Sequence, residues 1–147
     1  ENLKELLQIN PDVCVHDLHP LYLSTRYAQG IKGKRIPVQH HHAHMVSCMA
    51  EHRISGYVIG VVLDGTGMGD DGSIWGGEFL IGSRKHYQRV GHLRQVLLQG
   101  GDKAVSEPWR TALCYLHHLG INARDCLDLF DRSEVEVVQQ ALAANFN

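Results

Sequence analysis

Hydrophobic residues in the first half of the chain alternate between helical spacing and short β-type runs. The expected order is helix 2–9, strand 12–17, helix 19–30, strand 35–39 and helix 41–53. A proline at position 11 would stop the first helix, and Gly30 would close the second. Strands separated by helices are typical of parallel pairing with crossover connections, so this half predicts a β-α-β-α unit.

The pattern changes near Gly56, where strand-like runs follow one another through short turns. Strands are expected at 57–65, 73–82 and 85–98, with a glycine-rich turn at 65–72. This succession predicts an antiparallel β-meander. Pro108 and Gly120 suit the two ends of a helix at 107–120, and 121–147 predicts one or two further helices. The change of pattern divides the chain into domains at 1–55 and 56–147.

Composition narrows the classes of function. The chain has 147 residues, 44% of them hydrophobic, which is enough for one ordinary core. Its net charge of -2 offers no basic surface for phosphate backbones, so we expect no nucleic-acid partner. No apolar run approaches the roughly 18 residues that span a bilayer, and the first residues lack the charged-then-apolar order of a signal peptide, so we expect no membrane partner and a cytoplasmic location.

The cysteines form no CxxC pair and have mostly apolar neighbours, so we expect free, reduced and largely buried thiols. They are Cys14, Cys48, Cys114 and Cys126.

Five of the chain's eleven histidines crowd into one short stretch, HHHAHMVSCMAEH. Residues four apart on a helix share one face, about 6 Å apart along the axis, so His40 and His44 can bind one ion. His52 lies too far along the helix to join them. His41 and His42 point elsewhere and are expected to support the ligands from behind or to be exposed. Two histidines need a carboxylate from another segment, and the alternative is a solvated helix face.

A second segment, LDGTGMGDDGSIWGG, carries a stronger signal. A buried-type strand leads Asp64 into a turn of glycines, where backbone N–H groups can approach an anion closely. Because a carboxylate repels phosphate, Asp64 is suited to bind a metal ion or a water that faces a phosphate. The alternative is a plain hairpin in which Asp64, Asp70 and Asp71 only form the turn. Asp70 and Asp71 are expected to do no more than that.

A third segment, GGDKAVSEPWR, joins another glycine turn to a helix. Asp102 and Glu107 could accept hydrogen bonds from ribose hydroxyls, and Arg110 could pair with a carboxylate or a phosphate. The alternative is helix capping with a structural Arg110–Glu107 pair and Trp109 in the core. His19, which precedes a proline, is expected to be a turn residue.

Together, four segments resemble one known family. In order and spacing, DLHPLYLSTRYA, VQHHHAHMVSCMAEH, LDGTGMGDDGSIWGGEF and GGDKAVSEPWR resemble the hydrogenase maturation carbamoyltransferase family (HypF), over about residues 10 to 116. The match is to the middle of that family's transferase domain, which is similar to the tRNA threonylcarbamoyl transferase. It implies an α/β fold of the actin-like ATPase (ribonuclease H-like) class. Residues 1–55 would end lobe one, residues 56–147 would begin lobe two, and ATP would lie between the lobes.

The resemblance also implies roles for these residues. His40, His44 and Asp64 would bind a divalent ion, which could be iron, zinc or magnesium, and Asp64 would be catalytic. The nucleotide and substrate would contact Asp64, Gly65, Thr66, Gly67, Gly101, Asp102 and Glu107.

The implied reaction takes carbamoyl phosphate and ATP, by way of carbamoyl-adenylate, to carbamoylate the C-terminal cysteine of a partner protein in [NiFe]-hydrogenase maturation. The family's acylphosphatase-like, zinc-finger and adenylating domains are not among these residues, so the chain is expected to be a fragment that is inactive alone. Two alternatives remain open. One is an antibiotic O-carbamoyltransferase of the same fold, and the other is a metal-binding or partner-docking module without catalysis.

Overall fold

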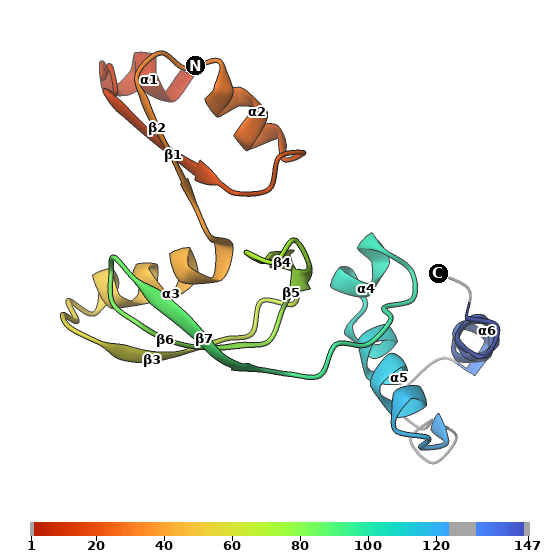
Figure 1. Cartoon of the computed structure of the whole chain (residues 1–147). Coiled ribbons are helices and arrows are strands. Elements are labelled where there is room, and N and C mark those ends of the chain that lie inside the picture. Colours follow the sequence, from red (N-terminus) through yellow and green to blue (C-terminus); the bar gives the residue numbers. More distant parts are fainter. Residues whose placement is uncertain (1, 124–131, 146–147) are drawn as a thin grey trace. The chain divides into compact units, whose positions relative to one another are not determined.

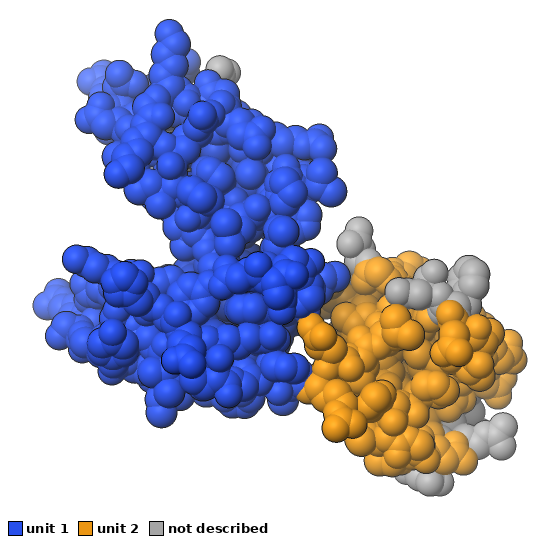
Figure 2. Space-filling model, viewed as in Figure 1, with its two compact units in different colours: residues 1–93 blue, residues 94–147 orange. Residues whose placement is uncertain are grey.

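The computed structural model describes residues 2–123 and 132–145. They form two compact units, Glu1–Leu93 and Arg94–Asn147, which are coloured separately in Figure 2. The lobe boundary expected after residue 55 concerns the arrangement of a larger domain and stays a prediction. We describe each compact unit by itself.

The first unit begins with the expected β-α-β arrangement. The elements are α1 (Asn2–Leu7), β1 (Val13–Asp17), α2 (Leu23–Gln29) and β2 (Lys34–Val38). The two strands pair in parallel from Val13↔Lys34 to Asp17↔Val38, which confirms the crossover prediction. This register places the carboxyl ends of both strands together, immediately before the histidine helix.

Helix α3 (His40–Glu51) begins directly after β2. Its N-cap is Gln39, whose side-chain oxygen accepts a hydrogen bond from the His42 backbone N–H at 2.7 Å, as capping requires. Met45 and Met49 form the buried stripe of the helix and pack against Val62 and Leu80. The histidines of the first turn therefore stand at a fixed end of a packed helix.

The expected antiparallel meander is confirmed. Strands β3 (Val58–Val62), β6 (Glu78–Gly82) and β7 (Tyr87–His92) form a sheet in the order β3-β6-β7, with α3 against it (Figure 1). Gly60 permits this packing, because a Cβ there would lie 2.6 Å from the Met45 sulfur. Strands β3 and β6, which flank the glycine turn, therefore both pack against helix α3.

One strand prediction was wrong. Residues 73–82 are not continuous but divide into β5 (Ile74–Trp75) and β6, and β5 pairs with β4 (Gly67–Met68) inside the predicted turn. The break falls at Gly76, where the backbone touches the preceding loop: a Cβ on Gly76 would lie 2.2 Å from the Gly65 oxygen. The N–H groups of Gly76 and Gly77 donate to the Glu78 carboxylate and not to a neighbouring strand, so the ladder is interrupted here. Likewise, the strand expected at 85–98 ends at His92.

The second unit is helical. It contains α4 (Asp102–Ser106), α5 (Pro108–His118) and α6 (Arg132–Ala143). Helix α5 starts at Pro108 and is followed by Gly120 at φ 68°, as predicted. The short helix α4 was not predicted, because its five residues carry no full helical period. One of the helices expected at 121–147 is α6; residues 124–131 lie outside the described part. The core of this unit consists of Leu113, Cys114, Ala123, Val135, Val138 and Leu142.

The cysteine prediction is partly wrong. Cys114 is buried and Cys14 partly buried, but Cys48 is exposed, since it lies four residues after His44 on the outer face of α3. All three are free, and Cys126 lies outside the described residues. Among the described helices, none has both the length and the apolar character to cross a membrane.

Candidate metal centre

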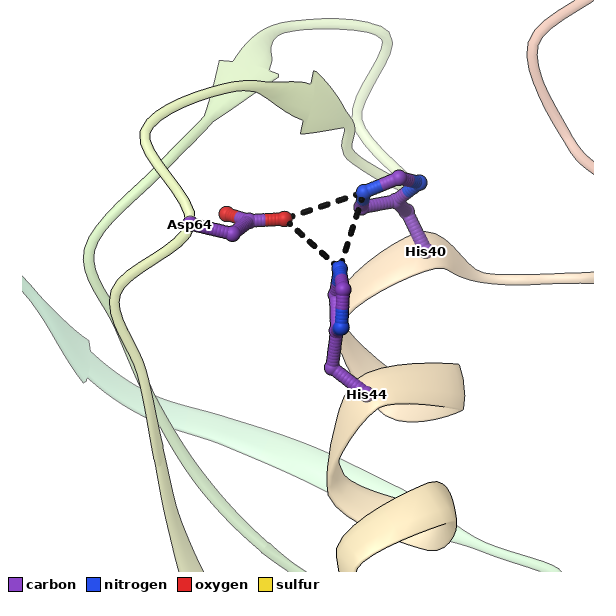
Figure 3. Close-up of side chains that lie close together, drawn as sticks. All are labelled: His40, His44 and Asp64. Carbon is purple, nitrogen blue, oxygen red and sulfur yellow. Dashed lines mark hydrogen bonds and ion pairs between the residues drawn. The ribbon is translucent and has the colours of Figure 1, made fainter.

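His40, His44 and Asp64 converge on one point at the end of α3 (Figure 3). The Nε2 atoms of His40 and His44 lie 3.2 Å apart. Asp64 Oδ2 lies 3.0 Å from the first nitrogen and 3.2 Å from the second. The histidines come from adjacent turns of the helix, and Asp64 follows β3, which packs against that helix. The structure therefore brings together the two histidines and the carboxylate named from the sequence.

The triangle fits one divalent ion. Ligand atoms about 2.0 to 2.2 Å from a shared ion lie roughly 3 Å apart, which is close to the three observed distances. Both Asp64 oxygens are buried and, among the described residues, have no partner with hydrogen-bond geometry. A buried carboxylate in that state is costly unless a cation meets it. Two histidines and one carboxylate also leave coordination positions open for a substrate.

Asp17 was missed by the sequence analysis and belongs to this site. Its Oδ2 lies 2.6 Å from His40 Nδ1, and its Oδ1 accepts a hydrogen bond from the His19 backbone N–H at 2.7 Å. A carboxylate only accepts, so His40 Nδ1 carries the proton and Nε2 is left to bind a metal ion. The position of Asp17 could have indicated this role, because Asp17 ends β1 and pairs with Val38, two residues before His40.

The electrostatics of Asp17 favour its charged form. Burial raises the pKa of this carboxyl, but hydrogen bonds from the His19 backbone and the His40 ring, together with the charge of His40, outweigh burial and lower it overall. A lowered pKa in the folded state stabilises the fold above the unfolded-state pKa, near 4, and this contribution is lost as the pH falls through the folded value. The anchor of His40 is therefore intact at neutral pH.

We expect Asp17→Asn to weaken zinc binding by about tenfold, because a neutral amide no longer fixes the proton on His40 Nδ1. Calorimetric titration of the 147-residue chain with Zn²⁺ would measure this change. Asp12→Asn is the matched control, since the exposed Asp12 precedes the same strand. Equal zinc affinities for Asp17→Asn and wild type would show that His40 needs no such anchor.

Of the two alternatives predicted for His41 and His42, support of the ligands or exposure, exposure is wrong for both. His42 is 8% exposed, and its Nε2 lies 2.8 Å from the Ser83 carbonyl oxygen. His41 is 0% exposed, with Nε2 2.9 Å from Asp64 Oδ1. Both point inward because they flank the buried stripe of α3. His41 does support the ligand set from behind.

His41 presents an N–H to Asp64. The amide of Gln39 is oriented by two contacts, since its oxygen accepts from the His42 N–H and its nitrogen donates to the Met68 carbonyl oxygen. That nitrogen, 3.2 Å from His41 Nδ1, can only donate, so the His41 proton lies on Nε2. The angle to Asp64 does not suit a hydrogen bond, and the attraction is electrostatic. Burial lowers the pKa of His41 against the raising effect of Asp64, which favours a neutral ring.

The loop after Asp64 is shaped by close packing. Gly67 lies against the histidine rings, where a Cβ would be 2.7 Å from His40 and 2.8 Å from His41. The Gly65 N–H donates to the Gly76 oxygen at 3.0 Å and is therefore already engaged. Thr66 is half-buried. The phosphate contacts expected of this loop remain a prediction.

Other predicted site residues make structural contacts. Glu107 forms an ion pair with Arg110, whose guanidinium lies 4.5 Å from the Trp109 ring centroid, so the structural reading of this pair is observed. Gly101 precedes α4 at φ 52°, and Asp102 begins that helix, its side chain being outside the described part. A ribose-binding role for this segment stays a prediction.

The prediction that Asp70 and Asp71 only form the turn is partly wrong. Asp71 accepts hydrogen bonds from the Ser73 backbone and hydroxyl within the turn, but it also accepts one from the Trp75 indole and lies beside Arg89. Asp70 accepts a hydrogen bond from Tyr87 in β7. The ring of His19 stacks on Tyr22 at 4.2 Å within its turn.

Two family models cover most of the chain. Residues 1–51 match the model described as the HypF Kae1-like domain. Residues 60–147 match the model described as carbamoyltransferase, Kae1-like domain, second subdomain.

Curated proteins and solved structures agree with these models. The chain is 46% identical over 123 residues to carbamoyltransferase HypF2 of Cupriavidus necator, covering 81% of this chain and 15% of that protein. It is 39% identical over 150 residues to carbamoyltransferase HypF of Rhodobacter capsulatus, covering 97% and 20%.

Among solved structures, the chain is similar to a crystal structure of full-length HypF in the phosphate- and nucleotide-bound form. The TM-score is 0.76 at 38% identity, over 99% of this chain and 19% of that one. It is also similar to HypF of T. kodakarensis, with a TM-score of 0.64 at 36% identity, over 80% and 16%. The chain thus spans about a fifth or less of these proteins. On the matches of both halves, it belongs to the HypF carbamoyltransferase family.

Proposed function

We propose that this chain is the metal-binding part of a carbamoyltransferase domain. The observation that carries the proposal is the convergence of His40, His44 and Asp64 at ligand distances, within a chain whose two halves match carbamoyltransferase models. Imidazole ligands favour zinc or iron over magnesium. The bound ion would polarise a phosphoryl or carbonyl oxygen of the substrate.

In this proposal the chain's residues hold that ion beside a nucleotide. Asp17 keeps His40 in the metal-binding tautomer, and His41 directs an N–H toward the charge of Asp64. The glycine loop from Gly65 to Gly67 would contact the phosphates of the nucleotide. Support for a nucleotide comes from the similar HypF structure, which was solved with phosphate and nucleotide bound. Two actin-like lobes, with ATP between them, are part of the proposal.

We further propose the substrates of the complete parent enzyme, acting in the cytoplasm. Carbamoyl phosphate, ATP and water would form carbamoyl-adenylate with release of phosphate and pyrophosphate. The thiol of the C-terminal cysteine of a hydrogenase maturation partner would then take the carbamoyl group and release AMP. These substrates are supported by the family to which the chain belongs and by the open coordination positions of the site.

Mass spectrometry of the partner tests this function. The parent enzyme, with carbamoyl phosphate and ATP, should add one carbamoyl group to the partner's terminal cysteine, and a partner with that cysteine changed to serine should gain none. Transfer to the hydroxyl of a small molecule instead would indicate an O-carbamoyltransferase. Metal binding without transfer to either acceptor would indicate a binding module and would refute the proposal.

A further inference from the structure

Glu78 is a buried charge that has no place in the metal triangle. It begins β6, is 2% exposed, and has both carboxylate oxygens engaged. Oε2 accepts a hydrogen bond from Arg89 Nε at 2.6 Å. Oε1 accepts from the backbone N–H groups of Gly76 and Gly77, at 3.0 and 3.4 Å. The side chain therefore ties β7 to the break between β5 and β6.

That break is joined to the Asp64 loop. The Gly76 carbonyl oxygen accepts the hydrogen bond from the Gly65 N–H, at 3.0 Å. The two backbones touch so closely that a Cβ on Gly76 would lie 2.2 Å from the Gly65 oxygen. Since Asp64 is the residue before Gly65, any shift of Gly76 is passed to the metal-binding carboxylate.

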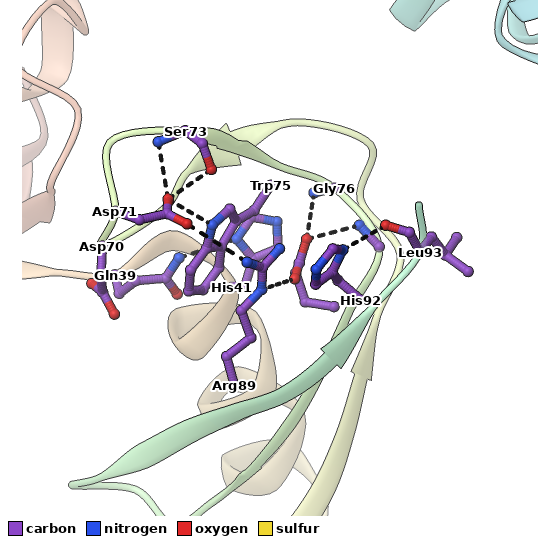
Figure 4. Close-up of polar contacts among 12 residues, drawn as sticks. Gln39, His41, Asp70, Asp71, Ser73, Trp75, Gly76, Arg89, His92 and Leu93 are labelled. Atoms are coloured by element: carbon purple, nitrogen blue, oxygen red, sulfur yellow. Dashed lines mark hydrogen bonds and ion pairs between the residues drawn. The ribbon is translucent and has the colours of Figure 1, made fainter. Parts of the chain in front are cut away.

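Besides Glu78, Arg89 contacts Trp75 and Asp71, which lie next to the Asp64 loop (Figure 4). Its guanidinium lies 4.2 Å from the Trp75 ring centroid and 3.6 Å from Asp71 Oδ2. The Trp75 indole N–H in turn donates to Asp71 Oδ1 at 3.0 Å, and its ring lies 5.8 Å from that of His41. Arg89 thus contacts both strands next to the loop, β5 through Trp75 and β6 through Glu78.

The network is poorly explained by stability alone. Arg89 Nη2 is buried and, within the described residues, has no hydrogen-bond partner. Burying a charged pair costs desolvation that its attraction often fails to recover, so two apolar side chains could fill this space as well. Burial raises the pKa of Glu78, but Arg89 and the two glycine N–H groups outweigh burial and lower it overall, so the carboxylate is charged at neutral pH. The charged pair of Glu78 and Arg89 instead fixes the backbone of Gly76 and Gly77.

We propose that Glu78 is a positioning residue: held by Arg89, its carboxylate fixes Gly76 and Gly77, and through the Gly76–Gly65 hydrogen bond it sets Asp64 opposite His40 and His44. This inference rests on the proposed metal site. The backbone arrangement itself can be tested without any metal.

Glu78→Gln is the sharpest variant, because an amide has one oxygen and can satisfy either Arg89 or the glycines but not both. We expect hydrogen exchange of the Gly65 amide, measured by NMR on the metal-free chain, to become at least about tenfold faster. Exchange at Leu80, which is fully buried in the central strand, should change much less. Zinc affinity should fall by about tenfold. Glu51→Gln, an exposed carboxylate at the end of α3, should match wild type.

Two results would overturn the inference: unchanged exchange at Gly65, or equal acceleration at Gly65 and Leu80, which would mean that Glu78 only supports global stability. If Glu78→Gln does not fold, Arg89→Gln serves instead, since it frees one Glu78 oxygen and leaves the other on the glycines. A wild-type chain that binds no zinc would remove the proposed function, while the exchange of Gly65 would still decide the role of Glu78.

Discussion

Replacing both His40 and His44 with alanine is expected to lower zinc affinity on the order of 100-fold or more, because two of the three convergent ligand atoms disappear. Calorimetric titration of the 147-residue chain would measure the loss. In wild type, the ion should also dissociate in acid, because a protonated imidazole cannot bind a metal ion.

The matched control replaces His117 and His118, the other adjacent histidines, at the end of α5 in the second unit. That variant should bind zinc like wild type. Unchanged affinity in the His40→Ala, His44→Ala chain would mean that zinc binds elsewhere, and a loss in the control would point to the end of α5.

Asp64→Asn is expected to slow carbamoyl transfer by the complete parent enzyme about tenfold or more, the effect of losing ~1.4 kcal/mol or more from one charge-assisted contact. The melting temperature should stay close to that of wild type. Among the described residues, neither Asp64 oxygen has a partner with hydrogen-bond geometry, so the uncharged amide gives up little that stabilises folding. Turnover at saturating carbamoyl phosphate and ATP is the measurement.

Asp70→Asn controls for the chemical change within the same segment. Asp70 is exposed and accepts a hydrogen bond from Tyr87, so its replacement should affect stability slightly and leave transfer unchanged. Wild-type turnover in Asp64→Asn would return Asp64 to the role of a turn former. A large loss of melting temperature in that variant would likewise assign Asp64 to folding.

Much of the first unit could be predicted because its signals are local. The spacing of His40 and His44 is a property of any α-helix, and the run from Val58 to Val62 is strand-like in itself. The failures lie where a distant contact overrode the local pattern. The strand predicted across Gly76 is interrupted where Gly76 bonds to the Glu78 side chain and to Gly65, eleven residues earlier in the chain.

By itself, the sequence determined the family, most of the helices and strands in their order, and three ligand candidates, because periodicity, turn residues and motif spacing involve residues that are close together in the chain. Only the tertiary structure decided which groups surround Asp64. The anchoring of His40 by Asp17 and the tie from Glu78 to the Asp64 loop depend on how strands and a helix pack. Such contacts join residues far apart in the chain, and the local sequence pattern around each residue does not indicate how close the two come in the folded protein.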